Sequence, residues 1–81
     1  MKTIHQDRYA TLIKTITAIR QEKNLTQVQL ADKLGKPQSF IAKVEGLDRK
    51  LDIIEFVDWC TAIEIKASDL IKEKFESDHI F

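Results

Sequence analysis

Residues 25–35 read Leu25-Thr-Gln-Val-Gln-Leu-Ala-Asp-Lys-Leu-Gly35, and this stretch decides the fold. Thr26 is suited to cap a helix, because its side chain can accept from the amide of Gln29 while the Gln29 side chain reaches back to the Thr26 amide. Leu25 and Leu30 hold the two positions of a hydrophobic staple around this cap. The stretch therefore predicts a helix that begins after Thr26 and ends about two turns later at the glycine.

A second short helix follows almost at once. Pro37 has the fixed φ that suits a first helical position, and the helix after it carries Ile41 and Val44 inward before it meets Gly46. Two short helices joined across a glycine-containing turn form a tight corner, which is the layout of a helix-turn-helix. The second helix of that motif enters the major groove of DNA, so we expect a recognition helix at about residues 37–45.

The rest of the chain is also predicted to be helical. Only two glycines and one proline punctuate the sequence, too few for a sheet protein with many tight turns. Asn24 is placed to close a first helix in the left-handed conformation, and Asp52 and Glu55 form a second capping box. Apolar residues recur at helical spacing in three further segments, at about residues 7–23, from the Asp52 cap to residue 63, and at about residues 67–75. We expect one all-α domain of five helices over residues 1–81, with its core at about 7–75 and a tail at 76–81.

Charge is distributed unevenly along the chain. The formal net charge is zero, but residues 1–50 carry ten cations and five anions (+5), whereas residues 51–81 carry three cations and eight anions (−5). A polyanion would therefore meet a molecule that is basic at one end. The alternative is a random scatter of surface charge.

Several classes of function are excluded. Cys60 alone cannot form an internal disulfide, and with His5 and His79 at opposite ends of the chain it makes no metal site. No nucleophile, histidine or carboxylate pair has catalytic spacing, so we expect no enzyme and no cofactor. No apolar stretch approaches the ~18 residues of a membrane helix, and the N-terminus has no secretory signal. These features favour a reducing compartment, the cytoplasm, and a core position for Cys60.

The stretch Leu25–Gly35, followed by Ile41-Ala-Lys-Val-Glu45, resembles the phage-repressor and Cro-like helix-turn-helix family, also called the xenobiotic-response-element (XRE) family. The resemblance spans roughly residues 12–71. It implies a compact, lambda-repressor-like domain of five helices that binds specific double-stranded DNA through its second and third helices, as a transcriptional regulator. A phage repressor, an antitoxin-type autoregulator and a restriction-modification controller all fit. The rival hypothesis is a helical protein-interaction module, antitoxin-like, that keeps the fold with weak or no DNA binding.

The predicted DNA contacts lie on and around the two short helices. Gln38 is the first candidate for base readout, because its amide can donate and accept at once, matching N7 and N6 of adenine. Two further residues of the recognition helix are candidate base contacts: Ser39 and Lys43. Helix starts and flanking cations supply the candidate phosphate contacts, which are Gln27, Val28, Lys36, Arg49 and Lys50. In the resembling family, the glutamine that matches Gln27 binds phosphate and also steadies the partner that matches Gln38.

Three positions depart from the family pattern. The family commonly has glutamate, any residue and then glycine after the recognition helix, whereas this chain has Glu45-Gly46-Leu47, which is expected to move the helix stop by one position. Glu64 stands where many members have glycine, so a left-handed turn there is either replaced or strained. Phe40 stands at a position that is usually polar or small, and its ring either contacts a thymine methyl group or packs against the preceding helix.

The fourth predicted helix is apolar around more of its circumference than one shallow core can use. Four of its residues can line one face toward the core: Ile53, Phe56, Cys60 and Ile63. Trp59 and Ile54 are then left toward solvent, which predicts a homodimer interface that includes Trp59 and Phe56. The alternative is that Trp59 covers the edge of its own core. A dimer would set two recognition helices about 34 Å apart and predict a palindromic operator.

Overall fold

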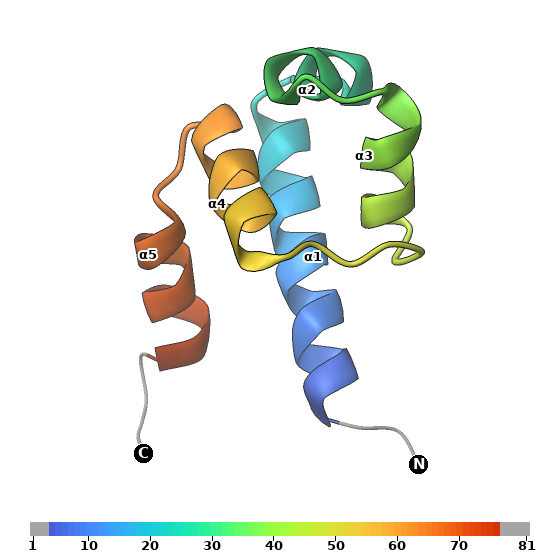
Figure 1. The fold of residues 1–81 in the computed structure, drawn as a ribbon. Coiled ribbons are helices and arrows are strands. Elements are labelled where there is room, and N and C mark those ends of the chain that lie inside the picture. Colours follow the sequence, from blue (N-terminus) through green and yellow to red (C-terminus); the bar gives the residue numbers. More distant parts are fainter. Residues whose placement is uncertain (1–3, 77–81) are drawn as a thin grey trace.

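The chain folds as a set of short helices packed around the long first one. The computed structural model describes residues 4–76, with side chains for residues 8–75. The elements in chain order are α1 (Ile4–Glu22), α2 (Gln27–Leu34), α3 (Gln38–Glu45), α4 (Ile53–Ala62), α5 (Ala67–Ile71) and a short π-helix, η1 (Lys72–Glu76). Figure 1 shows α2 across one end of α1, with α3 on one side of α1 and α5 on the other. The described residues contain no strand, and the predicted all-α class is confirmed. Residues 77–81 of the predicted tail lie outside the described residues.

Side-chain caps fix where α2 and α4 begin. The Thr26 Oγ1 accepts from the Gln29 amide at 3.0 Å, and the Thr26 amide donates to the Gln29 Oε1 at 2.8 Å. Asp52 and Glu55 make the same reciprocal pair, at 2.7 Å for the Glu55 amide and 3.0 Å for the Asp52 amide. Both predicted capping boxes are therefore present. Pro37 is the N-cap of α3 rather than its first residue, so the helix predicted at about residues 37–45 begins at Gln38.

The helices α1 to α4 all end with the same hydrogen-bonded closure around a left-handed residue. The four left-handed residues are Asn24 (φ 58°), Gly35 (φ 66°), Leu47 (φ 67°) and Glu64 (φ 65°). In each closure the amide of the left-handed residue donates three residues back, and the next amide donates five residues back. Glycine and asparagine tolerate this backbone, whereas leucine and glutamate adopt it at a cost of about 1–2 kcal/mol.

The expected shift of the α3 stop is wrong. Of the two alternatives for Glu64, the left-handed turn is kept, with the glutamate at φ 65°. Gly46 has φ −82° and stays in the last turn, while Leu47 takes the left-handed position. The closure requires this, because the amide of Asp48 bonds to the Lys43 carbonyl at 2.8 Å and the Leu47 amide to the Val44 carbonyl at 3.0 Å. A Cβ at Gly46 would lie 3.1 Å from the Ala42 carbonyl oxygen, so a side chain there would require that carbonyl to shift by a few tenths of an ångström.

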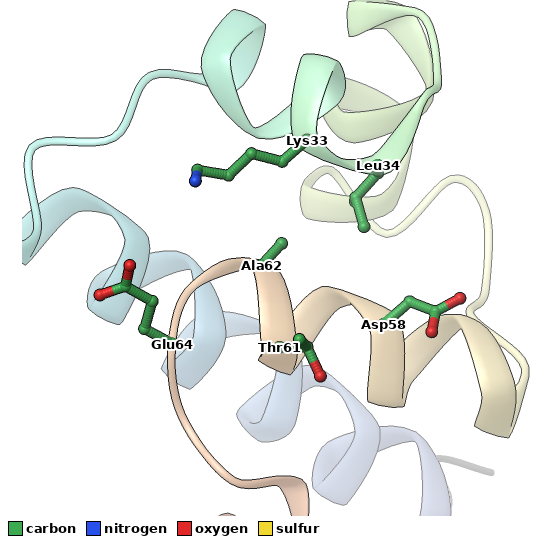
Figure 2. Close-up of a pocket in the computed structure, with 6 residues that line it drawn as sticks. All are labelled: Lys33, Leu34, Asp58, Thr61, Ala62 and Glu64. Carbon is green, nitrogen blue, oxygen red and sulfur yellow. The ribbon is translucent and has the colours of Figure 1, made fainter.

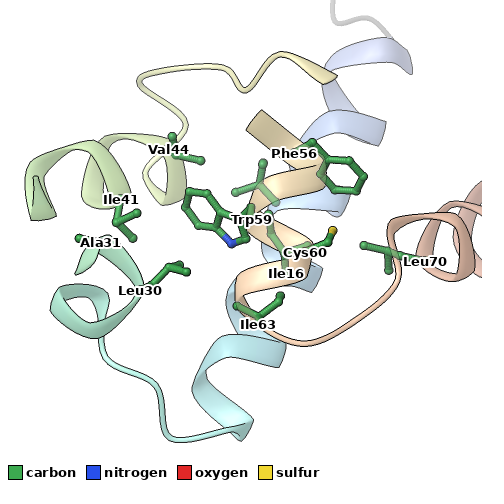
Figure 3. Packing of buried hydrophobic residues seen from close by; sticks show 11 residues of the cluster. Ile16, Leu30, Ala31, Ile41, Val44, Phe56, Trp59, Cys60, Ile63 and Leu70 are labelled. Carbon is green, nitrogen blue, oxygen red and sulfur yellow. The ribbon is translucent and has the colours of Figure 1, made fainter. Parts of the chain in front are cut away.

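The core is formed where α1, α2, α3 and α4 meet, with Leu70 of α5 at its edge, and Trp59 lies inside it. Figure 3 shows its ring reaching from α4 toward Val44 and Ile41 of α3. Trp59 is 0% exposed and Phe56 is 5% exposed, so the prediction that Trp59 faces solvent and that these two side chains form a dimer interface is wrong. Cys60 is buried as predicted, and burial raises the pKa of its thiol to about 11.

The solvent-facing side of α4 carries aliphatic residues. Ile54 is exposed, as predicted, with 66% of its surface accessible, whereas Ile53 was expected to line the core and is 69% exposed. Val57, one turn after Ile53, is 40% exposed. We call Ile53, Ile54 and Val57 the α4 apolar face. Within residues 4–76, no helix is long and apolar enough to cross a membrane.

Candidate nucleic-acid interface

The buried side of α3 determines which of its side chains face outward. Ile41 and Val44 are 0% exposed and anchor α3 to the core. The three candidate base contacts, Gln38, Ser39 and Lys43, are exposed on the remaining surface of the helix. The predicted outward presentation of these side chains is therefore found in the structure.

Gln38 is held by a neighbour from α2. Its Nε2 donates to the Gln27 Oε1 at 2.7 Å, and the Gln27 Nε2 donates to the Glu45 Oε1 at 2.9 Å. Gln27 is the first residue of α2 and Glu45 is the last residue of α3, so the two bonds tie the start of one helix to both ends of the other. The contact between Gln27 and Gln38 that the family resemblance implies is present.

We call the hydrogen bonds from Glu45 through Gln27 to Gln38 the relay. The relay ends on a buried ion pair between Glu45 and Arg20, which the sequence analysis did not predict. Arg20 of α1 donates from Nε to the Glu45 Oε2 at 2.7 Å and from Nη2 to the Glu45 Oε1 at 3.0 Å. Its Nη1 donates to the Leu25 carbonyl at 2.6 Å, and the two charged side chains are only 9% and 7% exposed. The available signal was that Arg20 lies one turn after Ile16, on the apolar stripe of α1, where a cation implies a buried partner.

The Glu45 carboxylate sets the direction of every amide in the relay. A carboxylate only accepts, so the Gln27 amide must turn its NH2 toward Glu45 and its oxygen toward Gln38. Gln38 must then donate to that oxygen, which leaves one N–H and the Oε1 of Gln38 for a ligand. An amide that donates and accepts side by side is the group that matches the N7 and N6 edge of adenine.

The start of α2 lies beside this relay. The backbone amides of Gln27 and Val28 belong to the first turn of α2, where amides have no partner within the helix and the helix dipole favours an anion. Val28 is 56% exposed, so its side chain does not cover this turn. The first turn of α2 can therefore donate to a phosphate group next to the Gln38 amide.

The three candidate cations differ in how they are engaged. The Lys36 Nζ lies 5.3 Å, and the Arg49 Cζ 4.8 Å, from the centre of the Phe40 ring. Arg49, a predicted phosphate contact, also forms a bidentate pair with Glu55, at 2.6 Å and 3.0 Å. The Lys50 Nζ lies 5.8 Å from the centre of the Tyr9 ring.

Phe40 is half-buried, and its ring packs inward. The centres of the Phe40 and Trp59 rings are 6.3 Å apart with the planes tilted by 50°. The ring thus packs on α4, a helix that neither sequence interpretation named. The phenyl group links α3 to the core, and its ring lies within cation–π distance of Lys36 and Arg49.

Comparisons with known proteins agree with this geometry. A family model described as Helix-turn-helix matches residues 16–70. The chain belongs to the helix-turn-helix family. Members of this family are DNA-binding regulators and not enzymes.

Two relatives of this helix-turn-helix chain are informative. The Immunity repressor protein of Bacillus phage phi105 is 39% identical over 71 residues, a match that covers 79% of this chain and 49% of the repressor. The chain thus spans about half the length of that relative. The solved structure of an XRE-family like protein from Pseudomonas syringae pv. tomato str. DC3000 superimposes with a TM-score of 0.87 at 38% identity, covering 91% of this chain and 90% of that one.

A surface groove lies between α2 and α4. It has a volume of about 450 Å³ and is lined by Lys33, Leu34, Asp58, Thr61, Ala62 and Glu64. Figure 2 shows Lys33 and Leu34 of α2 facing Ala62 across it. Its lining contains none of the candidate DNA contacts. Within the described part of the helix-turn-helix chain, no three potential metal ligands lie together.

Proposed function

We propose that this protein is a transcriptional regulator that binds specific double-stranded DNA with α3 in the major groove. The observation that supports it most is the relay from Arg20 through Glu45 and Gln27 to Gln38. The two hydrogen bonds also join α2 to α3, but a fixed amide direction at an exposed glutamine adds little to stability, whereas setting that direction before binding lowers the ordering cost of base readout.

In this proposal the exposed residues have separate roles. Gln38 pairs with an adenine, and Ser39 and Lys43 contact neighbouring bases from the same helix. The first turn of α2, at Gln27 and Val28, binds a phosphate, and flanking cations such as Lys36 and Lys50 bind further phosphates. The +5 charge of residues 1–50 supports this assignment, because every residue named for the proposed interface lies in that part of the chain.

The proposed outcome of binding is repression. Its support is the similarity to a phage protein named as an immunity repressor. A domain bound at a promoter can exclude polymerase by occupying its site, and this needs no further activity from the bound domain.

We also propose that the protein acts as a homodimer on a palindromic operator, with the α4 apolar face as the contact between subunits. Two isoleucines that are 69% and 66% exposed on adjacent positions of one helix support an interface at this face. Ile54→Asp should shift the sedimentation of a dimer to that of a monomer with the helical circular dichroism retained. Lys74→Asp, a charge change on the exposed surface of η1, is the control and should leave the assembly unchanged.

The test of DNA binding is a titration of a fluorescent random-sequence duplex at several salt concentrations. We expect log K to fall linearly with log salt, by about 0.9 per phosphate contact. Absence of binding at 50 mM salt would refute the proposal. It would favour the protein-interaction module, for which the α4 apolar face is the structural support.

A further inference from the structure

Glu55 is an anion that forms an ion pair with one of the candidate phosphate-binding cations. Glu55, in the first turn of α4, accepts from the Arg49 Nη1 at 2.6 Å and from the Arg49 Nη2 at 3.0 Å. The Arg49 Nη1 also donates to the Lys50 carbonyl at 2.8 Å. Three donor contacts of the guanidinium are thus made within the protein, and its charge is balanced by a carboxylate.

The Phe40 ring places this ion pair beside the recognition helix. Phe40 lies two residues after Gln38, and its ring has Arg49 and Lys36 as cation neighbours. The pKa of Glu55 is lowered to about 2, first by the hydrogen bonds from Arg49, then by the Asp52 amide, and to a smaller extent by the charge of Lys36. The carboxylate is therefore ionised at neutral pH, next to the cations at the edge of the proposed interface.

We propose that Glu55 limits the affinity of this protein for DNA of any sequence, by holding Arg49 in an internal ion pair and away from phosphate. The inference rests on the proposed function. A guanidinium paired with Glu55 releases no counterion from DNA, and the carboxylate repels an approaching phosphate. The protein thereby loses sequence-independent affinity, so that base contacts decide a larger share of its occupancy.

Glu55→Gln is the matched perturbation. Glutamine can serve at the third position of a capping box as glutamate does, so the start of α4 keeps its reciprocal hydrogen bonds. The Arg49 and Glu55 side chains are 42% and 21% exposed, so solvent screens the pair and its loss should leave the domain folded. The substitution therefore removes the charge of Glu55 and leaves the helix cap intact.

The experiment measures binding of a random-sequence duplex by fluorescence anisotropy between 50 and 200 mM salt. For Glu55→Gln we expect a steeper salt dependence, by about 0.9 in the slope of log K against log salt, because one more phosphate is contacted. The ratio of the variant's affinity to the wild-type affinity should therefore fall roughly 3.5-fold as the salt concentration rises from 50 to 200 mM. The same substitution in an Arg49→Gln background should produce no steepening.

Glu73→Gln on η1 is the control, because it makes the same change in net charge on an exposed residue of another element. It should keep the wild-type slope. The proposal is overturned if Glu55→Gln keeps the wild-type slope, or if it steepens the slope equally in the Arg49→Gln background. A wild-type protein that binds no duplex at all refutes the proposed function, and this inference with it, and is a distinct outcome.

Discussion

Replacing Glu45 by glutamine should cost a large part of the folding free energy, because Glu45 is the counterion of a buried arginine. The Arg20 and Glu45 side chains are 9% and 7% exposed and are joined by two hydrogen bonds of 2.7 Å and 3.0 Å. Leaving one charge of such a pair without its partner costs about 3–5 kcal/mol. A chain of 81 residues has a total stability of about 4–12 kcal/mol at 0.05–0.15 kcal/mol per residue, so Glu45→Gln should leave the fold marginal.

The double variant Arg20→Met/Glu45→Met separates stability from DNA readout. Replacing both members of a buried ion pair by apolar residues of similar size is often neutral or stabilising. The lost hydrogen bond to the Leu25 carbonyl costs about 1 kcal/mol, so we expect the double variant to lie within about 2 kcal/mol of wild type. Gln27 no longer has a carboxylate to set its direction, so the adenine preference at the Gln38 position should weaken although the fold is recovered.

Urea denaturation followed by the fluorescence of the single tryptophan, Trp59, measures both variants. The reasoning is refuted on the stability side if Glu45→Gln costs less than about 1 kcal/mol, below the range for a broken buried pair. On the functional side, it is refuted if the double variant binds with an unchanged base preference. That result would mean that Gln38 does not depend on the relay for its orientation.

Three further predictions concern strain, burial and titration. Leu47→Gly and Glu64→Gly should each raise the free energy of unfolding by roughly 0.5–1 kcal/mol. Glycine removes the strain of a side chain on a left-handed backbone, and its larger entropy in the unfolded chain cancels only part of that gain. A lower urea midpoint would contradict this. Trp59→Ala should cost about 3–5 kcal/mol and lower the helical circular dichroism, because the ring is in the core; a folded variant of unchanged stability would be inconsistent with that burial. The pKa of Glu55 is about 2 against an ordinary 4.5, so its charge stabilises the fold above about pH 5 and this contribution is lost as the pH falls toward 2; an NMR titration midpoint near 4.5 would argue against the Arg49 pair.

The parts of the fold that follow from neighbouring residues could be predicted from the sequence. Thr26 with Gln29, and Asp52 with Glu55, start helices through contacts three residues apart, and both caps form as predicted. Gly35 closes α2 with the backbone that its lack of a side chain allows. Signals of this kind need no knowledge of tertiary structure.

The parts that depend on packing could not be predicted in the same way. The α4 helix is apolar at most of its positions, so periodicity alone cannot fix the edge of its buried arc. Phe56, Cys60 and Ile63 are buried as predicted, but Trp59 takes the place in the core that was predicted for Ile53. Arg20 and Glu45 are 25 residues apart, and no local spacing relates them. Leu47 takes a left-handed backbone because the hydrogen bonds that close α3 require it there, against its own preference.

The residues of the candidate site could be predicted from the sequence better than their hydrogen-bond and ion-pair partners. Exposure of Gln38 follows from the inward positions of Ile41 and Val44, which periodicity identifies. The pairing of Arg49 with Glu55 links a loop to the next helix. From the sequence alone, Lys36 and Lys50 are equally good candidates to pair with that carboxylate. Assigning a cation to phosphate or to a protein carboxylate therefore needs the structure.

Selection of bound duplexes from a random pool, with wild type and Gln38→Ala in parallel, tests base readout by α3 most directly. Wild type is expected to enrich a palindromic sequence with an adenine at a fixed position in each half-site. Gln38→Ala should bind that sequence more weakly, by roughly 1–3 kcal/mol, and lose the preference at that base pair alone. An unenriched wild-type pool, or the same adenine preference in both proteins, would contradict it.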